Sequence, residues 1–220
     1  MPIQLVVFDL DGTLIDSSQD LADAVNALLR ELGAARLALE VITSMVGEGA
    51  AVLVRRALTA AGLPPETPGA LQRFLGHYGE RLTVHTRPYP GITEALDSLR
   101  AEHRTLAVLT NKPQQATATI LDRLGLARSL SLVVGGDTSA GRKPDPAGLS
   151  QIIEQAGTNA SSTVMVGDSP IDFETARRAG TGICLARYGF GYRFEGTAFR
   201  GDERFVDAAG ELPAAIRSFP

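Results

Sequence analysis

The chain has 220 residues, 44% of them hydrophobic and 21% charged, with a formal net charge of −4 at pH 7. This apolar content suffices for a buried core and excludes a disordered chain. The acidic balance, with no basic stripe, argues against nucleic acid as a partner. No apolar run reaches the roughly 18–20 residues that span a bilayer, and the N-terminus does not resemble a signal peptide. We expect a cytoplasmic protein without a membrane partner, either a monomer or a homodimer.

The first predicted element is a buried strand over residues 3–8, a short run rich in Val, Ile, Leu and Phe. The polar, glycine-containing segment from Asp9 to Thr13 follows it as a loop. From Ser18 to about Tyr78 the pattern becomes helical, without period-2 alternation. The expected helices are residues 20–32, 39–46, 50–61 and 69–82. This stretch is therefore expected to form a separate helical unit, from which the proline-containing residues 86–91 return.

After this return, strand and helix patterns alternate along the chain. The expected strands are residues 105–109, 130–134, 163–166 and 182–186, and the expected helices are residues 92–99, 113–124, 146–156 and 171–179. Such alternation predicts an α/β fold with a parallel sheet covered on both faces. Ligands of these sheets bind at the carboxyl ends of the strands.

Polar residues follow four of the predicted strands at that edge. They are Asp9 and Asp11, then Thr110, Asn111 and Lys112, then Gly135, Gly136 and Asp137 with Lys143 beyond, and finally Gly167, Asp168 and Asp172. This convergence on one edge is the strongest functional signal in the sequence.

The acidic residues of this edge suggest a metal and phosphate site. Carboxylates packed together raise one another's pKa unless a cation lies among them, and carboxylates with a phosphate oxygen are typical Mg²⁺ ligands. One carboxylate can attack phosphorus, and a second, two residues on, can move a proton. Lys143 and the Thr110 hydroxyl are candidates to hold phosphate oxygens, and Gly12 and Asn111 offer backbone N–H groups. The alternative is that Asp9 and Asp11 are ordinary turn and helix-cap residues.

Lysine is rare in this chain. Of 21 basic residues only Lys112 and Lys143 are lysines, and the rest are arginines. A compact ammonium group is therefore a hypothesis at both positions, with chance in an arginine-rich composition as the alternative. For Lys112 a solvated loop lysine is as good an interpretation as a side chain near the phosphate.

Four segments together resemble the haloacid dehalogenase-like superfamily. The run from Asp9 to Asp16 resembles its first motif, Leu109-Thr-Asn111 its second, Lys143-Pro144 its third and Gly167-Asp-Ser-Pro-Ile-Asp172 its fourth. The resemblance implies a Rossmannoid, doubly wound parallel sheet with an inserted α-helical cap domain. The core would comprise residues 1–15 and 88–220, and the cap with its linkers residues 16–87.

The resemblance also implies a role for each matching residue. Asp9 would be the nucleophile and Asp11 the general acid and base, with Thr110 and Lys143 stabilising charge. Mg²⁺ would be held by Asp9, the backbone carbonyl of Asp11 and Asp168, with Asp172 in support. Dehalogenases resemble this pattern but lack the second aspartate, so Asp11 favours phosphoryl chemistry on a small phosphorylated metabolite.

A finer resemblance points to phosphoglycolate phosphatases. It comes from the segments 45–50 and 55–58 of the expected cap, from Thr110-Asn-Lys-Pro113 and from Tyr188-Gly-Phe-Gly-Tyr192. The turn of Gly47, Glu48 and Gly49, with Arg55 or Arg56 nearby, is then a candidate site for the substrate's carboxylate. The alternative is a plain helix connection with solvated arginines. The segment after Tyr192 departs from that subfamily, which leaves the substrate open.

We therefore predict a Mg²⁺-dependent phosphatase that acts on a small phosphorylated metabolite through an aspartyl-phosphate on Asp9, with 2-phosphoglycolate as the first substrate hypothesis. Two other functions stay open at this point. One is a phosphomutase of the beta-phosphoglucomutase type, which passes the phosphoryl group to a sugar. The other is a module that binds a phosphorylated ligand without catalysis.

Overall fold

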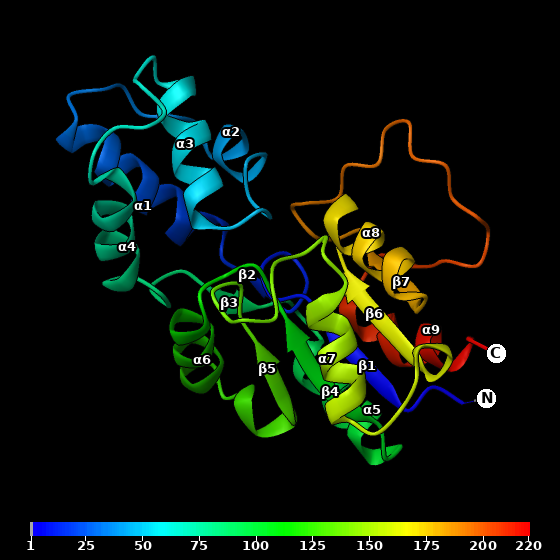
Figure 1. Ribbon diagram of the computed structural model, residues 1–220. Helices are drawn as coiled ribbons and strands as arrows, with labels where there is room; N and C mark the ends of the chain where they lie inside the picture. Colours follow the sequence, from blue (N-terminus) through cyan, green and yellow to red (C-terminus); the bar gives the residue numbers. More distant parts are fainter. Residues whose placement is uncertain (1) are drawn as a thin grey trace.

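A computed structural model describes residues 2–220. Its centre is a six-stranded sheet in the order β5-β4-β1-β6-β7-β8, in which every neighbouring pair is parallel (Figure 1). The strands are β1 (Leu5–Phe8), β4 (Thr105–Leu109), β5 (Leu132–Val134), β6 (Thr163–Gly167), β7 (Gly182–Ala186) and β8 (Arg204–Val206). The predicted α/β parallel fold is confirmed.

Helices cover both faces of this sheet. They are α5 (Ile92–Ala101), α6 (Gln114–Arg123), α7 (Ala147–Gln155), α8 (Pro170–Ala179) and α9 (Leu212–Arg217). In β1, Val6 and Phe8 belong to the same buried cluster as residues of α5, α6 and α9, whereas Leu5 and Val7 pack in a second cluster with α7 and α8. Because both faces of β1 are buried, its sequence is a continuous apolar run without alternation.

Four further helices form a helical unit beside the sheet (Figure 1). These are α1 (Ser18–Glu31), α2 (Leu39–Thr43), α3 (Ala50–Ala60) and α4 (Ala70–Gly79). They match the predicted helices, except that α2 and α4 end three residues earlier than expected. Their apolar faces continue the larger buried cluster of the sheet without a break, through residues such as Leu28, Leu58 and Phe74.

The two chain segments that join the helical unit to the sheet pair with each other. β2 (Ile15–Asp16) and β3 (Arg87–Pro88) form a two-stranded antiparallel sheet, a feature too short for sequence periodicity to predict. The buried carboxylate of Asp20 accepts hydrogen bonds from the backbone N–H groups of His85 and Thr86 and from the Thr86 hydroxyl. This carboxylate ties the start of α1 to the returning chain.

The last two elements of the chain, β8 and α9, were not predicted from the sequence. β8 has only three residues and α9 only six, and both follow a polar segment without clear periodicity. Among residues 2–220, no helix combines the length and the hydropathy that crossing a membrane requires.

Candidate active site

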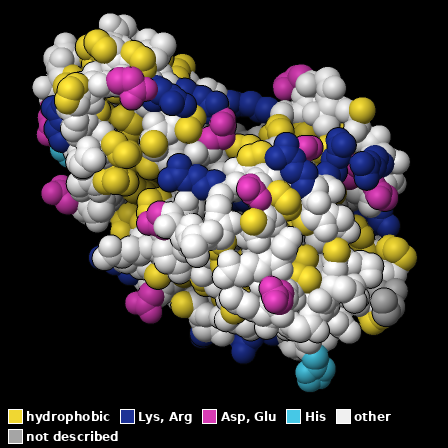
Figure 2. Space-filling model, in the orientation of Figure 1, with side chains coloured by type: hydrophobic (Ala, Val, Ile, Leu, Met, Phe, Trp, Pro, Cys, Tyr) yellow, Lys and Arg dark blue, Asp and Glu magenta, His cyan; other side chains and the backbone are white. Residues whose placement is uncertain are grey.

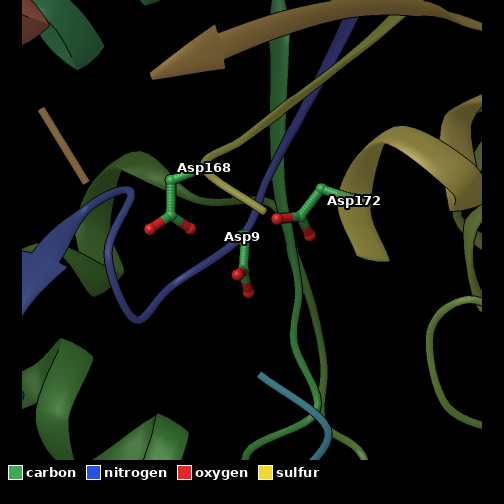
Figure 3. A group of neighbouring side chains, drawn as sticks. All are labelled: Asp9, Asp168 and Asp172. Carbon is green, nitrogen blue, oxygen red and sulfur yellow. The ribbon is translucent and has the colours of Figure 1, made fainter. Parts of the chain in front are cut away.

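Three aspartates meet at the carboxyl edge of the sheet. Asp9 follows β1, Asp168 follows β6, and Asp172 lies in the first turn of α8. Each offers a carboxylate oxygen within 4.8 Å of those of the other two, and all three residues are buried (Figure 3). The fold thus brings together residues that are more than 150 positions apart in the sequence.

The burial of this cluster shifts its titration. Desolvation raises the pKa of Asp9 to about 7, because burial and the Asp172 carboxylate outweigh the attraction of the Lys143 ammonium. Desolvation, together with Asp172 and Asp9, likewise raises the pKa of Asp168 well above its ordinary value. The raised pKa values indicate that the positive charge near these buried carboxylates is not sufficient to stabilise their ionised forms. A hard divalent cation with oxygen ligands fits this donor set.

Lys143 is the cation that the chain itself supplies to the cluster. Its ammonium lies 2.7 Å from Asp9 Oδ1 and 2.6 Å from Asp172 Oδ1, and its side chain is 2% exposed. The other Asp172 oxygen accepts hydrogen bonds from the backbone and hydroxyl of Ser169. Asp172 is therefore engaged on both oxygens and holds Lys143 in place beside Asp9.

Asn111 positions Lys143 and also reaches the helical unit. Its side-chain oxygen accepts from the Lys143 backbone N–H at 2.8 Å, and its Nδ2 donates to the Lys143 carbonyl at 2.9 Å. The same Nδ2 donates to the carbonyl of Gly47, which lies between α2 and α3, at 2.8 Å. The side chain of Asn111, rather than only its backbone, thus connects the two parts of the molecule.

Glycines allow the chain to pack closely around Asp168. A Cβ atom on Gly12 would lie 2.0 Å from Asp168 Oδ2, and one on Gly189 would lie 2.3 Å from Asp168 Cβ. The Gly191 N–H donates to Asp168 Oδ2 at 2.7 Å. The Gly12 N–H, expected to face phosphate, donates to the Ile15 carbonyl instead. The glycines at 189 and 191 therefore hold Asp168, a role that the sequence analysis did not assign to them.

Asp11 lies in a different environment from Asp9. Its Oδ1 accepts from the Ser17 hydroxyl at 2.5 Å, and its two oxygens lie 2.8 and 2.9 Å from the Lys112 ammonium. The side chain of Lys112 is 4% exposed, so the alternative of a solvated loop lysine is wrong. Nearby, the buried Thr110 accepts from the Lys112 backbone N–H through its hydroxyl oxygen, which leaves the hydroxyl proton available to a ligand.

A cavity of about 630 Å³ lies between this edge and the helical unit. Figure 2 shows the notch between the two parts, with basic side chains near it. Asp9, Asp11, Thr110, Gly47 and Gly49 all line the cavity. Two expected residues of the helical unit do not. Glu48 pairs with the exposed Arg56, and Arg55 is itself exposed on α3 outside the lining.

Comparisons with known proteins agree with this geometry. The family model described as haloacid dehalogenase-like hydrolase matches residues 6–186. A protein of Rhodospirillum rubrum named phosphoglycolate phosphatase is 43% identical over 84% of this chain and 80% of its own length. A plasmid-borne phosphoglycolate phosphatase of Cupriavidus necator is 36% identical over 98% and 94%.

A solved structure shows the same fold. The crystal structure of a predicted phosphoglycolate phosphatase from Haemophilus somnus superposes with a TM-score of 0.86 at 30% identity, covering 96% of each chain. The family model covers most of this chain, and two named phosphatases match it over most of their lengths. The chain therefore belongs to the haloacid dehalogenase-like hydrolase family, within which it is a phosphatase.

Proposed function

We propose that this phosphatase is Mg²⁺-dependent and hydrolyses a small phosphorylated metabolite, 2-phosphoglycolate in the first instance, through an aspartyl-phosphate on Asp9. One observation carries the proposal. Asp9 and Asp11 both line one cavity, yet Asp9 is held among buried carboxylates and Lys143, whereas Asp11 pairs with Lys112. Two carboxylates that reach one cavity from separate positions can serve as a nucleophile and as a proton carrier for the same substrate.

In the first step, an Asp9 carboxylate oxygen attacks phosphorus and the bond from phosphorus to the ester oxygen breaks. Asp11 donates a proton to the departing oxygen, which leaves as an alcohol. In the second step, Asp11 takes a proton from water as the water oxygen attacks the phosphoryl group on Asp9. This releases inorganic phosphate and restores both carboxyl groups. Lys143 and the Thr110 hydroxyl hold the phosphoryl oxygens during both steps.

The metal would be held by Asp9, the backbone carbonyl of Asp11 and Asp168, with Asp172 in support through Lys143. When bound, Mg²⁺ supplies positive charge against the phosphoryl oxygens and against the buried carboxylates. The raised pKa values of Asp9 and Asp168 without it support this assignment.

The helical unit would act as the cap of the site, with residues 16–87 as one part and residues 1–15 and 88–220 as the other. Gly47, Gly49 and, on the sheet side, Asn111 line the cavity and are proposed substrate contacts. Gly12 was expected beside them, but it lies outside this lining and its N–H donates to the Ile15 carbonyl. Glu48 and Arg55 were expected beside them. They lie outside the lining, so their contact with substrate would require the helical unit to move.

The proposed substrate rests on the relatives. Proteins of Rhodospirillum rubrum and Cupriavidus necator that share most of this chain's length are named phosphoglycolate phosphatases. The cavity has room for a molecule of this size, whose phosphate and carboxylate are joined by a single carbon.

The test is phosphate release from a panel of small phosphate esters that includes 2-phosphoglycolate, with Mg²⁺ and with EDTA. We expect release that requires Mg²⁺ and has its highest kcat/KM with 2-phosphoglycolate. Broad release would retain the chemistry and discard the substrate. No release from any ester, with sugar-phosphate isomerisation stimulated by glucose 1,6-bisphosphate, would indicate a phosphomutase instead.

A further inference from the structure

Lys112 has a contact on the helix-facing side of the cavity that the mechanism above does not use. Its ammonium is held by both oxygens of Asp11, and it also lies 4.6 Å from the centroid of the Tyr78 ring. Lys112 comes from the loop between β4 and α6, whereas Tyr78 comes from α4 of the helical unit. A cation of the sheet edge thus meets an aromatic ring of the helical unit, and both line the cavity.

The Tyr78 hydroxyl is a buried polar group with nothing to bind. Tyr78 is 4% exposed, and within residues 2–220 its hydroxyl has no hydrogen-bond partner. The Lys112 ammonium lies beside this side chain, 4.6 Å from the centroid of its ring. An unpaired buried hydroxyl destabilises the folded state, so such groups are usually paired in native proteins. A ligand in the cavity is a natural partner for this hydroxyl.

Lys112 and Tyr78 lie next to Asp11, the proposed general acid. Asp11, as general acid, faces the ester oxygen that leaves, and Lys112 contacts Asp11 directly. The part of the substrate joined to that oxygen must therefore lie near Lys112 and Tyr78. An ammonium has three N–H donors, and the two Asp11 oxygens do not exhaust them.

We propose that Lys112 and Tyr78 recognise a carboxylate on the substrate, one carbon away from the leaving oxygen. Lys112 supplies a charge-assisted hydrogen bond and Tyr78 donates its hydroxyl to the same group. This inference rests on the proposed function, and it identifies the residues that select an acidic phosphate ester over a neutral one.

The other cations of the cavity are less suited to this role. Arg123 and Arg142 line it but are exposed, so water screens their charge. Arg142 also donates its Nε to the Gly136 carbonyl at 2.7 Å. Lys112, by contrast, is a desolvated cation in contact with a reacting group, where a charge pair contributes more to selectivity.

The test compares two esters that differ only in the group at issue, 2-phosphoglycolate and 2-hydroxyethyl phosphate. Their kcat and KM are measured with Mg²⁺ for the wild type, Lys112→Met, Lys112→Arg and Tyr78→Phe, with Arg123→Met as a matched loss of charge at the exposed rim. The measured quantity is the ratio of kcat/KM for the two esters.

We expect the wild-type preference for 2-phosphoglycolate to fall at least about tenfold in Lys112→Met and about threefold in Tyr78→Phe. In both variants the loss should appear as a higher KM for 2-phosphoglycolate. Lys112→Arg should recover part of the preference, and Arg123→Met should change it less than about twofold. Tyr78→Phe is nearly isosteric, so it tests the proposal even if Lys112→Met does not fold.

Equal losses on both esters would show that Lys112 only positions Asp11, and would overturn the inference while leaving the phosphatase in place. An unchanged ratio in Tyr78→Phe and Lys112→Met would overturn it as well. A wild type that releases phosphate from neither ester would instead overturn the proposed function, and this inference with it.

Discussion

The phosphate end of the cavity and its helix-facing end are built in different ways. At the proposed phosphate end, buried carboxylates surround Lys143, and every group comes from one edge of the sheet, either from its loops or from the first turn of α8. At the helix-facing end, Lys112, Asn111 and Tyr78 join groups from the sheet edge to groups from the helical unit. We propose that the first end carries the chemistry and that the second selects the substrate.

The largest expected effect on activity comes from removing the proposed nucleophile, Asp9. Asp9→Asn keeps the size and hydrogen-bonding capacity of the side chain but cannot attack phosphorus. We expect kcat to fall by about a thousandfold or more, with little loss of stability. Steady-state phosphate release and thermal unfolding measure the two effects. Intact-mass analysis must show that no Asp has re-formed by deamidation, and an active variant without such reversion would contradict the mechanism.

Lys143→Met should be the most destabilising change at the phosphate end. It leaves Asp9 and Asp172 buried without their shared cation, and breaking a buried ion pair in this way costs about 3–5 kcal/mol. The matched control is Arg100→Met, which removes the exposed partner of Asp97 and should cost less than about 1 kcal/mol. Urea unfolding measures both, and equal costs would contradict the account of the buried cluster.

Asn111→Ala tests the connection between the two ends. It removes hydrogen bonds to Lys143 and to the Gly47 carbonyl, all of them short. We expect about 1–3 kcal/mol lower stability and about a tenfold loss of kcat/KM, because Lys143 and the helical unit are less well positioned. The control Gln19→Ala loses one exposed hydrogen bond to Asp23 and should change neither quantity measurably. An unaffected kcat/KM would show that Asn111 does not position the site.

The last prediction is a pH dependence of stability without metal. The pKa of Asp9 is about 7 in the folded state, above its ordinary 3.8, so the folded state holds this proton more tightly than the unfolded chain. Stability should therefore fall as pH rises from about 4 to about 7. Added Mg²⁺ should raise the melting temperature more at pH 8 than at pH 5. Asp9→Asn should show a weaker pH dependence, and a pH-independent effect of Mg²⁺ in the wild type would contradict the assignment.

The strands, the helices and the shared edge of the sheet could be predicted from the spacing of apolar residues along the sequence. Strand ends in a parallel sheet share one edge, so the alternation of strands and helices was enough to predict that Asp9, Thr110 and Asp168 would lie near one another. The helices of the helical unit were predictable from their apolar spacing, because each buries one face.

The remaining features depend on contacts between distant residues. Lys112 stayed ambiguous because its partner, Asp11, is 101 positions away, and only the scarcity of lysine set it apart. Tyr78 gave no signal beyond its place in a helix. The pairing of β2 with β3 was hidden because two residues show no periodicity, and the glycines at 189 and 191 gained a meaning only once Asp168 was seen against them.

The most direct test of the account is to look for the phosphoryl group on Asp9. The wild type is mixed with 2-phosphoglycolate and Mg²⁺, quenched in acid within the first turnover, digested, and examined by mass spectrometry. We predict one added phosphoryl group on the peptide that contains Asp9, labile to hydroxylamine and absent from Asp9→Asn. Turnover without this adduct, or an adduct on another residue, would contradict the central claim.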